Sequence, residues 1–172
     1  MTKKIISDAS TLILLEKVGL LDNLAKNINF IIPWEVYKEA VVEGKLRQYA
    51  DAHKIDRKIS KNLIKISEIK DYKKSNEIIK EFGIGKGETE AIILFFEEKA
   101  DLLAVDDHKP INVCKVYNIP FMTALNLVLK SYRTKIIDFK EAEEMIKNLG
   151  IYGRYKDELI YRALKLLEAK KW

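Results

Sequence analysis

In "LLAVDDHKP" (residues 102–110) a short apolar run is followed by two adjacent aspartates. Together with Asp101, the apolar residues form the run "DLLAV" (101–105), which predicts a buried strand, and Asp106 and Asp107 follow it directly. Two neighbouring carboxylates repel each other, and each loses hydration when it is drawn toward a protein interior. A buried strand that ends in this way raises the question of what offsets the two charges.

Three further runs predict strands that alternate with helices. They are "KKIIS" (3–7), "INFII" (28–32) and "IPFMT" (119–123), while "NLIKI" (62–66) is either an extra strand or a connector. The segments between them have helical spacing. This alternation predicts an α/β fold with a mainly parallel central sheet flanked by helices. We expect one domain over residues 1–172, in which residues from about 133 to 172 form a helical C-terminal extension.

Composition narrows the class of protein. The chain has 172 residues, of which 48% are hydrophobic, so it can bury a real core. We find no apolar run long enough to span a bilayer and no signal-peptide pattern at the N-terminus. The single cysteine, Cys114, excludes an intrachain disulfide and a cysteine-rich zinc site. We therefore expect a cytoplasmic protein without a membrane partner.

Charge is concentrated in one part of the chain. The net charge is +5, and residues 45–81 alone carry 11 Lys and Arg against 6 Asp and Glu, which is also +5. Such a basic stretch favours an anionic partner.

Acidic residues recur where this fold would place a ligand. Ligands of parallel sheets bind at the carboxyl ends of the strands, where Asp8, Asp106 and Asp107 are expected. Glu88 shares a helical stripe with apolar residues and is predicted to point inward, whereas Glu90 is predicted to be solvated. Gathered carboxylates favour a hard divalent cation, Mg²⁺ or Mn²⁺.

Four segments together resemble PIN-domain proteins, with the closest likeness to the VapC-like toxins and their stand-alone prokaryotic relatives. They are "IISDASTLILLEKVGLLDNL", "IIPWEVYKEAV", "GKGETEAIILFFEEKADLLAVDDHKP" and "IPFMTALNLVL", and they cover about residues 3–130. The resemblance implies a three-layer PIN-like fold and a metal-dependent endoribonuclease. Its implied catalytic positions are Asp8, Glu39, Glu88 and Asp106.

The resemblance also suggests roles around these positions. Asp8, Glu88, Asp106 and Asp107 are the implied metal ligands, and which of the paired aspartates is the main one stays open. Ser10 matches a hydroxyl residue that supports the first aspartate. RNA contacts are expected from Lys45, Arg47, Lys54, Arg57, Lys58, Lys61 and Lys109, the last where many relatives have arginine. Expected partners are RNA, a small antitoxin protein and a second copy of the chain.

Simpler interpretations remain for these residues. Asp8 and Glu88 can cap helices, Glu39 can lie on a solvated helix face, and one of Asp106 and Asp107 can belong to a polar turn. The cations near the C-terminus, Arg154 and Lys156 among them, are interpreted as a solvated face, with RNA contact as the weaker alternative. Alternative functions are an RNA-maturation or DNA nuclease, or a catalytically silent PIN-like module that binds RNA or protein.

Overall fold

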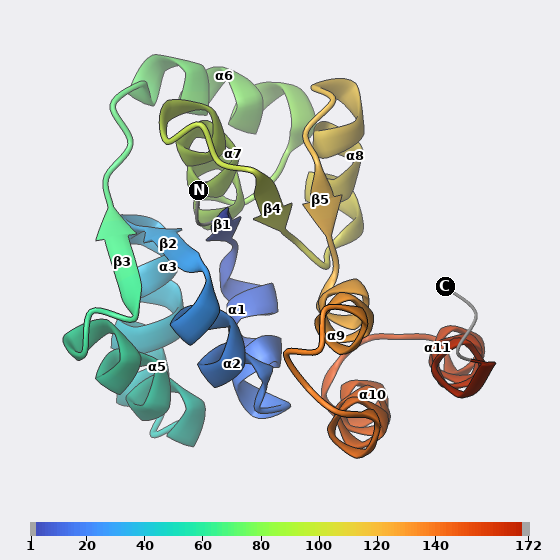
Figure 1. Cartoon of the computed structure of the whole chain (residues 1–172). Helices are drawn as coiled ribbons and strands as arrows, with labels where there is room; N and C mark the ends of the chain where they lie inside the picture. The colour runs from blue at the N-terminus through green and yellow to red at the C-terminus, as the bar shows by residue number, and fades with distance from the viewer. Residues whose placement is uncertain (1–2, 170–172) are drawn as a thin grey trace.

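The computed structural model describes residues 3–169 and shows a three-layer α/β fold (Figure 1). In chain order the elements are β1 (Lys4–Ser7), α1 (Ala9–Lys17), α2 (Leu20–Asn27), β2 (Asn29–Pro33), α3 (Trp34–Tyr37), the π-helical segment η1 (Lys38–Glu43), α4 (Gly44–Leu46), α5 (Ala50–Ser60), β3 (Ile64–Ser67), α6 (Tyr72–Phe82), α7 (Lys86–Glu97), β4 (Leu102–Ala104), α8 (His108–Val116), β5 (Phe121–Met122), α9 (Ala124–Arg133), α10 (Phe139–Tyr152) and α11 (Asp157–Ala169).

The five strands pair in parallel in the order β3-β2-β1-β4-β5. Because successive side chains point to opposite faces of a strand, adjacent residues of β1 and β2 enter different cores. Ile5 and Phe30 face one core, whereas Ile6 and Ile31 face the other. The central strands β1, β2 and β4 are therefore largely buried on both faces, as is typical of parallel sheets, while the edge strands β3 and β5 are more exposed. The predicted α/β class and parallel sheet are confirmed, and segment 62–66 contributes to an edge strand, β3.

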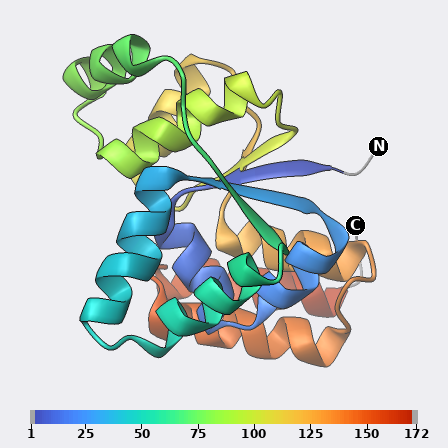
Figure 2. The same ribbon diagram turned by 90° about the vertical axis from the view of Figure 1, so that its left-hand side faces the viewer.

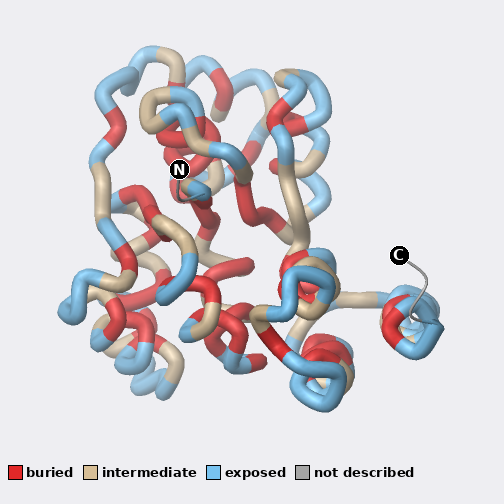
Figure 3. Tube along the Cα trace, in the orientation of Figure 1, coloured by how far each residue is buried: buried red, intermediate tan, exposed pale blue. Residues whose placement is uncertain are grey.

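Two layers of helices cover the two faces of the sheet, as Figure 2 shows edge-on. Helices α6, α7 and α8 pack on the core that contains Ile6 and Ile31. Helices α1, α2, α5, α9, α10 and α11 contribute to the larger core on the other face. In Figure 3 the buried segments run along the central strands and along parts of the helices that cover them. Cys114 lies in the first core and is buried.

Residues 133–169 are helical and pack on the larger core rather than standing apart from it. Ala142, Ile146 and Leu149 of α10 are buried there, together with Ala163 and Leu167 of α11. None of the helices within residues 3–169 is long and apolar enough to cross a bilayer. The C-terminal helices α10 and α11 therefore complete the larger core, to which α1 and α9 also contribute.

The helix after β2 is less regular than its sequence predicts. It begins as α3, widens into the π-helical turn η1 and ends as α4, and Gln48, two residues after α4, adopts a positive φ of 60°. Gly44 allows α5 to fold back closely, because a Cβ at this position would lie 2.7 Å from the Cβ of Ala52. A π-helical turn inside a helix is frequent at functional sites. This one carries Glu39.

Candidate metal centre

Two helices begin directly after neighbouring strands, and they bring two aspartates to one edge of the sheet. Asp8 follows β1, and its Oδ1 accepts a hydrogen bond from the Thr11 backbone N–H at 2.9 Å, which caps α1. Asp107 follows β4 and precedes α8, but its carboxylate makes no capping bond. The Ser10 hydroxyl donates to Asp107 Oδ2 at 3.2 Å and lies 3.3 Å from each oxygen of Asp8. Ser10 therefore lies between the two aspartates.

Glu88 completes a group of three carboxylates. It occupies the first turn of α7, where its Oε2 accepts a hydrogen bond from the Gly85 backbone N–H at 2.7 Å. This is the capping contact expected under the simpler interpretation. Yet carboxylate oxygens of Asp8, Glu88 and Asp107 also lie within 4.8 Å of one another. We call these three residues the acidic cluster.

The electrostatics of the acidic cluster favour a bound cation. Within residues 3–169, no lysine or arginine forms an ion pair with any of its carboxylates. Burial raises the pKa of Asp8 to about 7, and the charges of Asp106 and Asp107 add to the effect. Converging oxygen donors without a positive partner fit a hard divalent cation, which Mg²⁺ and Mn²⁺ exemplify.

Glu39 lines the same hollow as the acidic cluster. Burial raises its pKa, and so do the charges of Glu35, Glu43 and Glu88, while the Gly87 backbone lowers it. The contact with Gly87 is close: a Cβ at Gly87 would lie 2.8 and 2.9 Å from the two carboxylate oxygens of Glu39. The carboxylate of Glu39 therefore occupies space that exists because residue 87 has no side chain.

Gly87→Ala is expected to weaken Mn²⁺ binding by roughly tenfold, the lower end of what displaced outer carboxylates cost metal sites. The added methyl group would push the Glu39 carboxylate away from the hollow. Calorimetric titration with Mn²⁺ measures the effect. Gly85→Ala is the matched control, since a Cβ there would meet Glu88 Oε2 at an ordinary 3.5 Å. Equal Mn²⁺ affinity of the two variants would contradict the prediction.

Asp106 is held differently from its neighbour Asp107. Its Oδ2 accepts a hydrogen bond from the Ala124 backbone N–H at 3.0 Å, and its Oδ1 accepts one from the Tyr155 hydroxyl. Burial raises the pKa of Asp106 to about 6. The Tyr155 oxygen in turn accepts a hydrogen bond from the Leu125 backbone N–H at 3.2 Å. The geometry thus places Asp107 in the acidic cluster and ties Asp106 to α9 and the C-terminal segment.

The contact of Tyr155 with Asp106 was not predicted from the sequence. Tyr155 lies 49 residues from Asp106 in the chain, between two helices, and belongs to no motif that points to the strand ends. A tyrosine flanked by cations near the C-terminus is a common surface pattern, so its sequence carries little signal. The contact depends on the packing of α10 against the larger core.

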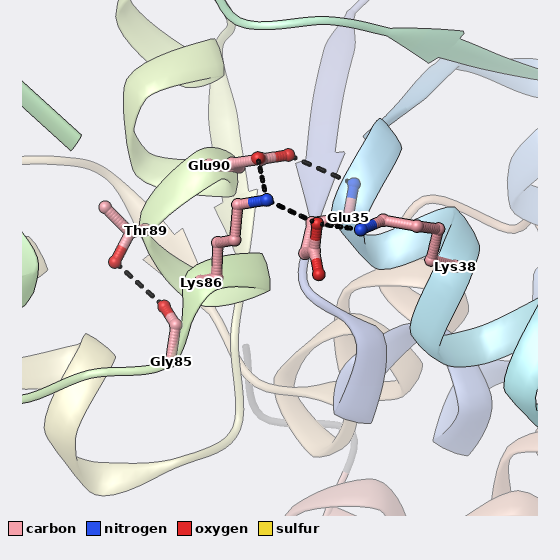
Figure 4. Close-up of polar contacts among 6 residues, drawn as sticks. All are labelled: Glu35, Lys38, Gly85, Lys86, Thr89 and Glu90. Atoms are coloured by element: carbon pink, nitrogen blue, oxygen red, sulfur yellow. Dashed lines mark hydrogen bonds and ion pairs between the residues drawn. The ribbon is translucent and has the colours of Figure 1, made fainter. Parts of the chain in front are cut away.

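The prediction that Glu90 is solvated is wrong. Glu90 is 4% exposed, and its Oε2 accepts a hydrogen bond from the Glu35 backbone N–H at 3.0 Å (Figure 4). Lys86 lies between the two acids, 2.9 Å from Glu35 and 3.8 Å from Glu90. The helical wheel misplaced Glu90 because α3 packs against α7 and covers that side of the helix. This network fixes α3 next to α7 and so positions Glu39 beside Glu88.

The prediction that Lys58 contacts RNA is wrong, because its side chain is buried and paired. Its side chain is 8% exposed and forms ion pairs with Glu16 at 2.7 Å and with Asp22 at 3.2 Å. A cation buried in this way has no access to an RNA backbone. Lys45 forms an ion pair with Asp56 of α5 at 2.5 Å, whereas Arg47 is 66% exposed and lies 3.9 Å from Glu43. Lys58 therefore serves local structure, while the RNA contacts predicted for Lys45 and Arg47 stay predictions.

The other predicted RNA contacts divide into two places. Lys54, Arg57 and Lys61 line a hollow at the far end of α1, together with Lys17, and that hollow includes none of the predicted acids. Lys109 lines the hollow of the acidic cluster, where its Nζ donates to the Gly83 carbonyl at 3.1 Å. Of the seven predicted contacts, Lys109 is the one that the structure brings to the acids.

A parallel α/β sheet with unpaired carboxylates at the carboxyl ends of its strands defines a class of proteins suited to bind a divalent cation at that edge. Within this class the chain belongs to the PIN-domain family: the model of the family DUF3368, described as a PIN domain, matches residues 4–169. The match includes α10 and α11, and PIN domains are a nuclease family that generally depends on divalent metals. A search of curated proteins found no match to this chain.

Proposed function

We propose that this protein is a metal-dependent endoribonuclease that hydrolyses RNA phosphodiester bonds. One observation carries the proposal: Asp8, Glu88 and Asp107 converge within 4.8 Å at the carboxyl edge of a PIN-domain sheet. None of the three has a cationic partner among residues 3–169. Membership of the family supports nuclease activity in general, and the choice of RNA as substrate is part of the proposal.

The proposal gives each acidic residue a role. Asp8, Glu88 and Asp107 would hold Mg²⁺ or Mn²⁺, which supplies the Lewis acidity that activates water and offsets charge on the scissile phosphate. Ser10 lies between the two aspartates, and its hydroxyl donates one hydrogen bond to Asp107 Oδ2, which helps to hold that carboxylate beside Asp8. Glu39, whose pKa is raised by burial, lies at the rim of the same hollow and accepts the proton of the attacking water.

Asp106 contributes by positioning rather than by direct coordination. Its two oxygens are engaged by the Ala124 N–H and the Tyr155 hydroxyl, which fixes the start of the loop that leads to Asp107. Because a misplaced ligand weakens a metal site, this anchor holds Asp107 at the acidic cluster. The proposal thus assigns the ligand role to Asp107, within the pair that the sequence left open.

The wider setting is also part of the proposal. We propose that the enzyme acts in the cytoplasm as a homodimer and as the toxin of a toxin–antitoxin pair. A small antitoxin would block the acidic hollow. The VapC-like resemblance of the four sequence segments supports these partners, and the buried thiol of Cys114 is compatible with a reducing compartment.

The test is cleavage of matched RNA and DNA panels in Mn²⁺ and in EDTA, by the unmodified protein and by Asp8→Asn. We expect RNA cleavage that requires Mn²⁺ and falls at least about a hundredfold in Asp8→Asn, because a direct ligand matters no less than outer groups do. Asp71→Asn is the matched control, since Asp71 caps α6 through a 2.9 Å bond from the Lys74 N–H but lines no acidic hollow.

Each result has a definite meaning. Loss of cleavage in Asp8→Asn but not in Asp71→Asn supports the nuclease and its site. Cleavage of DNA in place of RNA would move the assignment to a DNA nuclease with the same site. RNA binding without any cleavage by the unmodified protein would favour a silent binding module.

A further inference from the structure

A second hollow lies beside the acidic cluster and is lined in part by the C-terminal segment. It has a volume of 590 Å³, and its lining includes Ser10, Asp107 and residues 152–156. Ser10 and Asp107 also line the hollow of the acidic cluster, so the two hollows meet there. A ligand chain whose reacting group lies at the acidic cluster would extend directly along residues 152–156.

Residues 152–156, "YGRYK", comprise the last residue of α10 and the tight connection to α11, and they are held firmly in place. The Gly153 N–H donates to the Leu149 carbonyl at 2.8 Å, and the Tyr155 hydroxyl joins Asp106 to α9. The turn is tight, because a Cβ at Gly153 would lie 2.7 Å from the Tyr155 ring. The anchored tyrosine therefore sets where the residues on either side of it lie.

Those flanking residues, Arg154 and Lys156, are exposed cations that line the second hollow. Neither forms an ion pair with any residue in the range 3–169. Their charge is thus available to an anion, in contrast to the charges of Lys45 and Lys58, which neighbouring acids neutralise. Lys17 adds a third positive charge at this hollow.

An aromatic surface accompanies these cations. Tyr152 is 52% exposed and lines the hollow, and Lys17 Nζ lies 5.9 Å from the centroid of its ring. Single-stranded nucleic acids bind to this combination, because cations contact the phosphates while bases stack on aromatic rings. An acidic peptide would use the cations but would gain little from an exposed ring.

We propose that residues 152–156 bind the RNA strand next to the scissile phosphate, with Arg154 and Lys156 on backbone phosphates and Tyr152 stacked on a base. This inference rests on the proposed nuclease function. It replaces the interpretation of Arg154 and Lys156 as a solvated face, and it places the main RNA surface on the C-terminal segment instead of on residues 45–61.

The test measures binding of a fluorescein-labelled single-stranded RNA of about 15 nucleotides, near the upper site size of single-strand binders. Fluorescence anisotropy is recorded over a salt series in the cleavage-deficient Asp8→Asn background. For the added double substitution Arg154→Gln/Lys156→Gln, the slope of log K against log salt should fall by about 1.4, that is, about 0.7 for each lost phosphate contact. Tyr152→Ala should weaken binding by roughly tenfold, within the range measured for loss of a stacked base.

The matched control is Lys99→Gln/Lys115→Gln in the same background. Both lysines are exposed, and they lie at the opposite edge of the sheet, before β4 and in the last turn of α8. The same change in net charge there should leave the slope unchanged. Equal melting temperatures of the variants exclude unfolding as the cause of a difference.

Cleavage by the otherwise unmodified protein is measured in parallel, so that two failures can be told apart. If that protein cleaves RNA while Arg154→Gln/Lys156→Gln binds with an unchanged slope, the inference is overturned and the proposed function stands. If the protein neither cleaves nor binds RNA, the proposed function fails and the inference fails with it.

Discussion

Asp8→Asn is expected to raise the melting temperature of the metal-free protein at pH 8, by up to about 10 °C. The reason is the cost of holding an ionised carboxylate in a buried position. Asp8 is 1% exposed, and burial raises its pKa from 3.8 to about 7. A difference of about three pKa units corresponds to roughly 4 kcal/mol of folding free energy as an upper limit. Asparagine removes the charge and can still cap α1.

The sign of the pH dependence follows from the same shift. Because the pKa is higher in the folded than in the unfolded protein, ionisation of Asp8 opposes folding. Stability contributed by its neutral form is present below pH 4 and is lost as the pH rises toward about 7. Asp8→Asn should therefore exceed the unmodified protein in melting temperature at pH 8, and the difference should narrow toward pH 4.

Scanning calorimetry in EDTA measures this difference, and Mn²⁺ provides a second condition. A divalent cation that binds the folded state should raise the melting temperature of the unmodified protein and should raise that of Asp8→Asn much less. Asp71→Asn, at a cap away from the acidic cluster, should show neither effect. A lower melting temperature of Asp8→Asn in EDTA at pH 8 would show that the carboxylate is not held at a cost.

Lys58→Met should destabilise the protein by about 3–5 kcal/mol, the usual result of removing one partner of a buried ion pair. The Glu16 side chain is 4% exposed and lies 2.7 Å from Lys58 Nζ. Without the lysine its charge would remain in the core between α1 and α5 without compensation. Asp22 loses the same partner but is half-exposed, so water can replace the lysine there.

Urea denaturation measures this loss of folding stability, and two further variants test its cause. Lys58→Met combined with Glu16→Leu should recover most of the stability, since an apolar pair can replace a buried ion pair at little net cost. Lys54→Met, on the exposed side of the same helix, should change stability little. A small effect of Lys58→Met alone would mean that Glu16 takes up a proton or reaches water.

A good part of this molecule could be predicted from local patterns. Short apolar runs indicated the strands, two of which are followed by acids, and the alternation of strands with helices indicated a parallel sheet. The carboxyl ends of parallel strands lie at one edge of the sheet, so Asp8 and the pair Asp106–Asp107 were expected together. Glu88 was expected to join them because it lies in the first turn of the helix that became α7. Each of these inferences needs only the geometry of one element and the direction of the chain.

The remaining features of the site, namely which charged side chains are buried or paired, depended on contacts between distant segments. Which aspartate of the pair faces the acidic cluster is decided by Tyr155, which holds Asp106 from 49 residues away. Glu90 is buried because α3 covers it, and Lys58 is buried because Glu16 and Asp22 surround it. Local patterns placed Glu90 and Lys58 in solvent, because the cost of burying a charge can be offset only by a partner that tertiary packing supplies. The sequence by itself thus determined the strands, the sheet edge and the kinds of ligand gathered there, while the tertiary structure decided which charges are paired, which are buried and which remain free to bind.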